Sequence, residues 1–186
     1  MGIDDAVTAR AVYLDRDGVL NRAMVRDGKP YPPASPAEFE ILPGVPEALA
    51  RLRKAGFRLV VVTNQPDVAR GVTPLSTIEA IHARMAAILP LDAIEACLHS
   101  HDGECDCRKP QPGLLLRDAA AHGVDLRGSF MVGDRWRDID AGAAAGCRTI
   151  LVDEGYAERA PARPPDHVCG SLPEAAEWIL SRGEKP

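Results

Sequence analysis

Val12-Tyr-Leu-Asp-Arg-Asp-Gly-Val-Leu-Asn21 is the stretch of sequence that decides the fold. Its apolar opening is typical of a fully buried strand, and the strand ends in two acids, Asp15 and Asp17, separated by one residue. Gly18 then allows the backbone to turn sharply. In an open α/β sheet, ligands bind at the carboxyl ends of the strands, so the pattern predicts a site here.

Two further apolar segments end in polar side chains in the same way. Phe57–Thr63 is β-branched and apolar almost throughout, as a central parallel strand should be, and Asn64 follows it. Ser129–Val132 is a shorter strand that ends just before Asp134. We predict an α/β fold with a doubly wound, Rossmann-like, mainly parallel sheet and helices on both faces, so that these side chains converge at one edge.

The remaining elements follow from apolar spacing and from glycine or proline at their ends. His82, inside one expected helix, should be a surface or packing residue. The expected helices cover about residues 45–55, 73–89, 112–121, 138–146 and 172–180, and the further strands cover 91–96, 147–152 and 167–168.

The chain has the size and composition of one soluble globular domain, residues 1–186. It is 46% hydrophobic and 26% charged, with no break in composition. Residues 22–40 contain four prolines and show neither helix nor strand periodicity. They are too short for a separate cap domain, so we expect a flap beside the site, with Arg22, Arg26 and Lys29 as candidate anion contacts.

The charge balance argues against a general affinity for polyanions. A net charge of −5 offers no attraction to nucleic acid or to an anionic membrane. The first ten residues carry two acids and lack the apolar core of a secretory signal, and no apolar run reaches transmembrane length. We therefore expect a cytoplasmic location and, without a cap or an obvious exposed apolar face, a monomer.

Four residues in the loop 97–107 form a metal-ligand pattern. Cys97-x-His99 and Cys105-x-Cys107 match a closed tetrahedral zinc site with three cysteines and one histidine. A closed site leaves no open position for water, so we expect a structural Zn²⁺ that holds the loop. His101 is an alternative to His99 as the fourth ligand.

Two cations follow the zinc loop directly. If zinc holds Cys107, the backbone positions of Arg108 and Lys109 are held as well. Lys109 would supply a point charge for a phosphoryl group, and Arg108 a fork for a phosphate or hydroxyls at the other end of the substrate.

Acids at the strand ends point to a hard cation. Asp15 and its neighbouring acid would repel each other unless a cation such as Mg²⁺ neutralised them, and Asp134 can complete its ligand shell. Asp138 can hydrogen bond to the groups that surround the metal ligands, or it can cap a helix. Thr63 and Asn64 can donate to phosphate oxygens, or they can simply cap and turn the chain.

These motifs resemble, in order and spacing, those of the haloacid-dehalogenase superfamily of phosphatases. The resemblance rests on four segments between Val12 and Val152, which are Asp15-Arg-Asp-Gly-Val, Thr63-Asn-Gln, Lys109-Pro and Gly133-Asp-x-x-x-Asp138. The cysteine pattern is similar to that of the small, capless, zinc-containing branch, which includes heptose bisphosphate and histidinol-phosphate phosphatases.

The resemblance implies roles for the site residues. Asp15 would attack phosphorus and carry an aspartyl-phosphate, and Asp17 would act as general acid and base. Mg²⁺ would be bound by Asp15, by the backbone carbonyl of Asp17 and by Asp134. Thr63, Asn64 and Lys109 would hold the phosphoryl oxygens.

The resemblance leaves two substrates open. Pro112-Gly-Leu-Leu and the segment 63–71 are similar to the heptose enzymes, which favours removal of the 7-phosphate from D-glycero-D-manno-heptose 1,7-bisphosphate. The short interval between Cys97 and Cys105 is more similar to the histidinol-phosphate enzymes. Arg135 stands where the heptose enzymes commonly have lysine, and we expect Arg108 and Arg135 at the distal end of the substrate. The sequence leaves open the preferred anomer and whether the product enters lipopolysaccharide or another glycan.

Two other classes fit less well. A receiver domain would use similar residues for signalling, but it needs an acid after the third strand, where this chain has Cys97 and His99. A nucleic-acid end-processing phosphatase is disfavoured by the acidity and by the lack of a basic stripe.

Overall fold

A six-stranded parallel sheet forms the centre of the molecule in the computed structural model, which describes residues 9–27, 29–100 and 104–183. The strand order is β5-β4-β1-β6-β7-β8, and every neighbouring pair is parallel. The strands are β1 (Arg10–Leu14), β4 (Phe57–Asn64), β5 (Ala93–Cys97), β6 (Phe130–Gly133), β7 (Arg148–Val152) and β8 (His167–Cys169).

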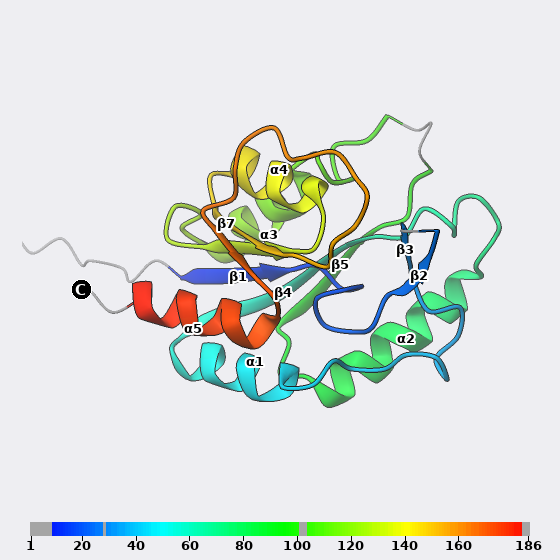
Figure 1. Ribbon diagram of the computed structural model, residues 1–186, viewed down its shortest axis with the longest axis horizontal. Helices are drawn as coiled ribbons and strands as arrows, with labels where there is room; N and C mark the ends of the chain where they lie inside the picture. The colour runs from blue at the N-terminus through cyan, green and yellow to red at the C-terminus, as the bar shows by residue number, and fades with distance from the viewer. Residues whose placement is uncertain (1–8, 28, 101–103, 184–186) are drawn as a thin grey trace, which may run out of the picture.

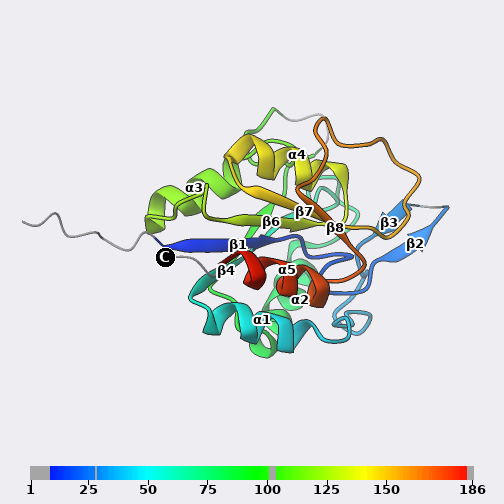
Figure 2. The ribbon, with the colours of Figure 1, turned by 60° about the vertical axis from the view of Figure 1, so that its left-hand side comes forward.

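Helices cover both faces of this sheet, which confirms the predicted fold class. One face carries α1 (Val45–Lys54), α2 (Leu75–Ile88) and α5 (Leu172–Gly183). The other carries α3 (Gly113–His122) and α4 (Trp136–Ala145), as Figures 1 and 2 show. Each boundary lies within a few residues of the expected one, because the helices end at glycine or proline.

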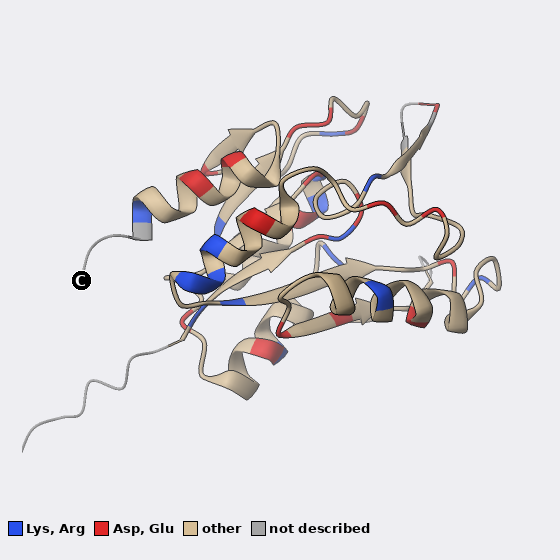
Figure 3. Cartoon of the chain, turned by 90° about the horizontal axis from the view of Figure 1, so that it is seen from below, with Lys and Arg blue, Asp and Glu red and all other residues tan. Residues whose placement is uncertain are grey.

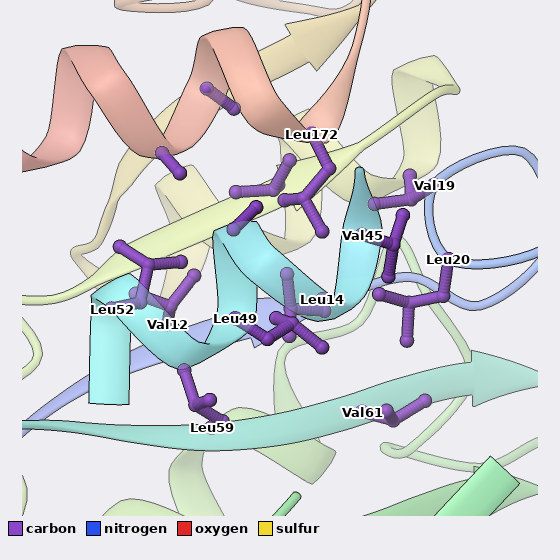
Figure 4. Close-up of a cluster of buried hydrophobic side chains, with 14 of the residues drawn as sticks. Val12, Leu14, Val19, Leu20, Val45, Leu49, Leu52, Leu59, Val61 and Leu172 are labelled. Carbon is purple, nitrogen blue, oxygen red and sulfur yellow. The ribbon is translucent and has the colours of Figure 1, made fainter. Parts of the chain in front are cut away.

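A hydrophobic core lies on each face of the sheet, and the alternating side chains of β1 contribute to both. Val12 and Leu14 point to the face covered by α1, whereas Ala11 and Tyr13 point to the opposite face, and all four are fully buried. Figure 4 shows Leu49 of α1 close to Leu14 and to the side chains of β4. Full burial of one such leucine stabilises the fold by about 1.5–3 kcal/mol.

The chain changes direction in the sheet at β1. From β1 it moves outward through β4 and β5, and it then returns to build β6, β7 and β8 on the other side. The loops after β1 and β6 therefore diverge toward opposite layers, which opens a crevice between them. The N–H of Asp15 donates to the carbonyl of Val132 at 2.9 Å, so the residues that follow both strands lie at the same point.

The flap contains strands that periodicity did not predict. Met24–Arg26 (β2) and Lys29–Tyr31 (β3) pair as an antiparallel hairpin, separate from the main sheet (Figure 2). Strands of three residues are too short to show an alternating pattern of apolar and polar residues. Pro30 in β3 also argued against a strand, because proline is unusual inside strands. Part of the expected flap is therefore a short hairpin.

The described residues include no helix that is both long and apolar enough to cross a membrane. On the side seen in Figure 3, acidic and basic residues are interspersed along the helices and loops, and no continuous run of basic residues crosses the described part of that side.

Candidate active site

Lys109, Asp15 and Asp138 form the centre of the site, with Asp15 directly after β1 and Asp138 in α4. The Nζ atom of Lys109 lies 2.7 Å from Oδ1 of Asp15 and 2.6 Å from Oδ1 of Asp138, and it donates to the carbonyl of Val62 at 2.6 Å. Lys109 is 2% exposed, so its charge is compensated by these acceptors rather than by water. The structure brings together Asp15 and Lys109 as the sequence predicted.

Burial and neighbouring charges set the protonation of this group. Burial raises the pKa of Asp15 to about 6, with the negative charges of Asp138 and Asp17 adding to the rise and Lys109 opposing it. Burial alone would lower the pKa of Lys109, but the two carboxylates outweigh it and raise that pKa. Lys109 therefore remains cationic at neutral pH.

Asp134 shows where a cation fits. Both of its carboxylate oxygens are buried and form no hydrogen bond of normal geometry within the described part of the chain; the nearby hydroxyl of Tyr156 opposes the rise in the pKa of Asp134. Burial, together with Asp15 and Asp138, raises its pKa well above the usual range. One oxygen from each of these three acids lies within 4.8 Å of the others. A divalent cation with oxygen ligands satisfies the orphaned oxygens and favours the ionised carboxylates.

Two glycines make room for these acids. Gly18 has a φ of +89°, and a Cβ there would lie 2.1 Å from Oδ2 of Asp134. A Cβ on Gly133 would lie 2.1 Å from Cβ of Asp138. A side chain at either position would displace a carboxylate of the cluster, so the two glycines are needed for the close approach.

Asp138 has two uses, of which the sequence predicted one. Its Oδ2 atom accepts from the N–H of Arg135 at 3.0 Å and so caps α4, as expected. Its Oδ1 atom binds Lys109, which sequence reasoning did not foresee. With both oxygens engaged, Asp138 is better placed to hold Lys109 than to supply a cation ligand, although it belongs to the acid cluster.

The Asp17 side chain turns toward a set of donors. It accepts from Arg16, from Nδ2 of Asn21 at 3.0 Å and from Nε2 of Gln65 at 3.1 Å. Asp17 and Asp15 line the same cavity. The sequence analysis did not predict the donors to Asp17, although Arg16 lies within the segment 12–21.

Thr63 and Asn64 end β4 in the cavity, as predicted, but they make different contacts. The hydroxyl of Thr63 accepts from Gln65 at 2.9 Å, which leaves its own hydrogen available for a ligand. The side-chain amide of Asn64 instead exchanges two hydrogen bonds of 3.0 Å with the backbone of Lys109. One hydrogen of the Asn64 Nδ2 group thus braces the lysine and its second hydrogen remains for a ligand, so donation from Asn64 to a phosphate stays a prediction.

The cysteine and histidine side chains gather as the spacing predicted. The Sγ atom of Cys97 lies 3.8 Å from Sγ of Cys105, 3.2 Å from Sγ of Cys107 and 3.5 Å from Nδ1 of His99. Tetrahedral zinc with bonds to sulfur of about 2.3 Å holds two sulfurs about 3.8 Å apart, so these residues could hold zinc. His101, the alternative ligand, lies outside the described residues.

Arg108 is attached to this cluster. Its NH1 group donates to the carbonyl of His99 at 3.2 Å, and the side chain lines the cavity of about 320 Å³ that also contains Asp15 and Lys109. Arg108 therefore connects His99 of this cluster to the cavity.

Arg135 and Arg137 line the same cavity from the start of α4. Arg135 forms a two-point ion pair with Glu158, which lies in the segment between β7 and β8. Burial and the positive charges of Arg135 and Arg108 lower the pKa of Arg137. Sequence reasoning missed Arg137 and Glu158; the basic tripeptide 135–137 was the only local signal for the former.

Among the flap side chains that the structure describes, two prolines and a tyrosine line the cavity, and the expected cation Arg22 is paired elsewhere. Pro30, Tyr31 and Pro32 line the cavity. Arg22 forms an exposed ion pair with Glu40 at 3.0 Å. The side chains of Arg26 and Lys29 lie outside the described part of the structure.

The chain matches a known hydrolase family and known relatives. A family model described as HAD-hydrolase-like matches residues 106–175. A D-glycero-beta-D-manno-heptose-1,7-bisphosphate 7-phosphatase from Pseudomonas putida is 40% identical over 155 residues, which cover 81% of this chain and 86% of that protein. Its counterpart from Bordetella bronchiseptica is 39% identical over 92% of this chain and 98% of that protein.

Solved structures agree with these matches. The D,D-heptose 1,7-bisphosphate phosphatase from B. bronchiseptica, complexed with magnesium and phosphate, superimposes with a TM-score of 0.76 and 37% identity, covering 93% of this chain and 99% of that one. The phosphatase from Burkholderia thailandensis has a TM-score of 0.65 and 34% identity, covering 92% of this chain and 99% of that one.

Proposed function

Since this chain belongs to the D-glycero-β-D-manno-heptose-1,7-bisphosphate 7-phosphatase family of HAD-like hydrolases, we propose that it removes the 7-phosphate from D-glycero-D-manno-heptose 1,7-bisphosphate. It is a phosphoric monoester hydrolase, and the observation that carries the choice of substrate is a cavity with two cationic regions. Lys109 lies beside Asp15, and Arg108, Arg135 and Arg137 line the same cavity. One region suits the phosphoryl group that is transferred, and the other suits a second phosphate.

The reaction begins with Asp15. Its carboxylate attacks phosphorus, the bond from phosphorus to the sugar oxygen breaks, and Asp17 donates a proton to that leaving oxygen. Asp17 then takes a proton from water, which attacks the aspartyl-phosphate and releases inorganic phosphate. Lys109 and the free hydrogen of Thr63 hold the phosphoryl oxygens. Asn64 and Asp138 keep Lys109 in place.

The acid cluster would hold Mg²⁺ through Asp15, the backbone carbonyl of Asp17 and Asp134. Bound there, Mg²⁺ would supply positive charge that allows a carboxylate and a phosphate to approach each other. The orphaned oxygens of Asp134 support this proposal. The magnesium in the B. bronchiseptica structure supports it independently.

A second metal would have a structural role. We propose that Cys97, His99, Cys105 and Cys107 bind Zn²⁺ and that the loop 97–107 thereby holds Arg108 toward the cavity. Three cysteines can bind zinc only while they remain reduced, and a reducing compartment keeps them so, which supports a cytoplasmic location. We further propose that residues 1–186 act as one phosphatase domain, with a flap at 22–40, and work as a monomer.

Histidinol phosphate is the second candidate substrate, favoured by the short interval between Cys97 and Cys105. The decisive experiment measures steady-state phosphate release from both anomers of heptose 1,7-bisphosphate, from fructose 1,6-bisphosphate and from histidinol phosphate. We expect the highest kcat/KM for a heptose bisphosphate. A higher value for histidinol phosphate would overturn the substrate while leaving the mechanism intact.

A further inference from the structure

Arg16 is the most deeply buried cation near the site. Its side chain is 0% exposed, and its guanidinium lies between Asp17 and His82. The Nε group donates to both carboxylate oxygens of Asp17 at 3.2 Å, and NH2 donates to Oδ2 at 2.9 Å. The NH1 group lies 3.1 Å from Nε2 of His82 in α2.

The contact with His82 requires a neutral imidazole. Arginine can only donate, so Nε2 of His82 must present its lone pair to NH1. Burial and the positive charge of Arg16 lower the pKa of His82 to about 4, which agrees with that requirement. His82 is therefore an acceptor that α2 holds against the far side of the guanidinium.

The fork of Arg16 restricts Asp17. Two donor groups on one carboxylate fix both its direction and the plane in which its lone pairs lie. A group that transfers protons must sit within hydrogen-bond reach of the reacting oxygen, and a displacement of about 1 Å can cost about 100-fold in rate. Among the donors to Asp17 in the described part of the chain, only Arg16 brings a full positive charge to hydrogen-bond distance.

We infer that Arg16 is the positioning residue that orients Asp17 for proton transfer, and that His82 keeps Arg16 in that orientation from α2. The inference rests on the proposed phosphatase function and assigns a task to two residues that the reaction scheme does not use. A purely structural role, in which the pair only joins β1 to α2, predicts a different pattern of rates.

The leaving group separates the two roles. A sugar alkoxide needs a proton from Asp17 as it departs, whereas p-nitrophenolate is a weak base and departs without one. The value of kcat/KM reports the steps up to that departure. We would compare His82→Leu, which removes the acceptor, with His82→Gln, whose amide oxygen can take the place of Nε2. Melting temperature and zinc content serve as checks of the fold.

We expect His82→Leu to lower kcat/KM for heptose 1,7-bisphosphate at least about 10-fold more than for p-nitrophenyl phosphate, mainly through kcat, and His82→Gln to recover most of the loss. Equal losses on both esters, or no recovery with glutamine, would overturn the inference. If His82→Leu does not fold, Arg16→Lys, which keeps the charge but not the fork, must show the same selective loss; equal losses there would also overturn it.

The wild-type protein keeps this test separate from the proposed function. If it hydrolyses simple alkyl phosphates but not heptose bisphosphate, the proposed substrate fails. The comparison of leaving groups is then made with an alkyl phosphate that it does hydrolyse, and the positioning role is judged on that substrate.

Discussion

The Nζ atom of Lys109 lies 2.7 Å from Oδ1 of Asp15, although 94 positions separate the two residues in the chain. Both side chains are almost inaccessible to water, so the ion pair is screened very little. A phosphoryl group arriving at Asp15 therefore meets a fixed positive charge that needs no reorganisation.

Asp15→Asn should abolish turnover. An amide is not a nucleophile toward phosphorus, so we expect phosphate release to fall by at least about 10⁴-fold. The fold should persist, because the amide oxygen can still accept from Lys109. Phosphate release and a thermal melt check this prediction, and Glu154→Gln, at an exposed acid, is the control with near-wild-type rates. Wild-type activity in the Asp15→Asn variant would show that Asp15 is not the nucleophile.

Cys107→Ser should remove the proposed zinc and weaken the site together. We expect less than one zinc per chain, a lower melting temperature and a reduced kcat/KM, because the loop then no longer orders Arg108. Metal analysis of the purified protein provides the measurement. Cys169→Ser lies outside the cluster and keeps a donor to Leu151 and Ser171, so its zinc content should match wild type. An active protein without zinc would contradict this role for the loop.

Arg137→Gln should affect substrates with two phosphates selectively. Arg137 faces the like charges of Arg135 and Arg108, and a bound anion relieves that repulsion. We expect KM for heptose 1,7-bisphosphate to rise about 10-fold, or about 1.4 kcal/mol, with little change for a sugar monophosphate. Arg127→Gln, an exposed arginine, is the matched control. An equal rise in KM for both kinds of substrate would argue against a second phosphate site.

Asp118→Ala should destabilise the fold without touching the site. Its buried carboxylate accepts from Arg58 at 2.8 Å and from the hydroxyl of Tyr13 at 3.1 Å. Without this carboxylate, Arg58 and the hydroxyl of Tyr13 lose their acceptor. We therefore expect the free energy of unfolding to fall by about 3 kcal/mol. Denaturant titration measures this change. Glu177→Ala, which breaks an exposed pair with Arg51, should cost less than about 1 kcal/mol.

His82 should make the stability of the protein depend on pH. Its pKa is lowered from 6.5 to about 4 by burial and Arg16, so the unfolded chain binds a proton more readily. The stability that it contributes is full above about 6.5 and is lost as the pH falls toward about 4. We expect His82→Gln to lose less stability than wild type between pH 7 and 5 in denaturant titrations. If both proteins lost the same stability between pH 7 and 5, the folded protein would not hold His82 in its neutral form.

The sequence by itself determined the sheet, the acids at its edge and the grouping of Cys97, His99, Cys105 and Cys107. These are local patterns: apolar runs predict buried strands, and the cysteines and the histidine occur as two pairs, 97/99 and 105/107, each with one intervening residue. Asp15 and Asp134 could be assigned to one edge because parallel strands end there. Among the described strands, those of the flap hairpin were not predicted, since they have three residues each.

The tertiary structure alone decided which side chains meet. Asp138 binds Lys109, Asn64 braces the lysine backbone, and Arg16 is enclosed by Asp17 and His82. Apart from the adjacent Arg16 and Asp17, the partners come from segments far apart in the chain, and their contacts depend on how the loops close. A polar residue that looks solvated in sequence becomes buried once helices cover it, and burial then requires a partner, because an unpaired buried charge costs several kcal/mol.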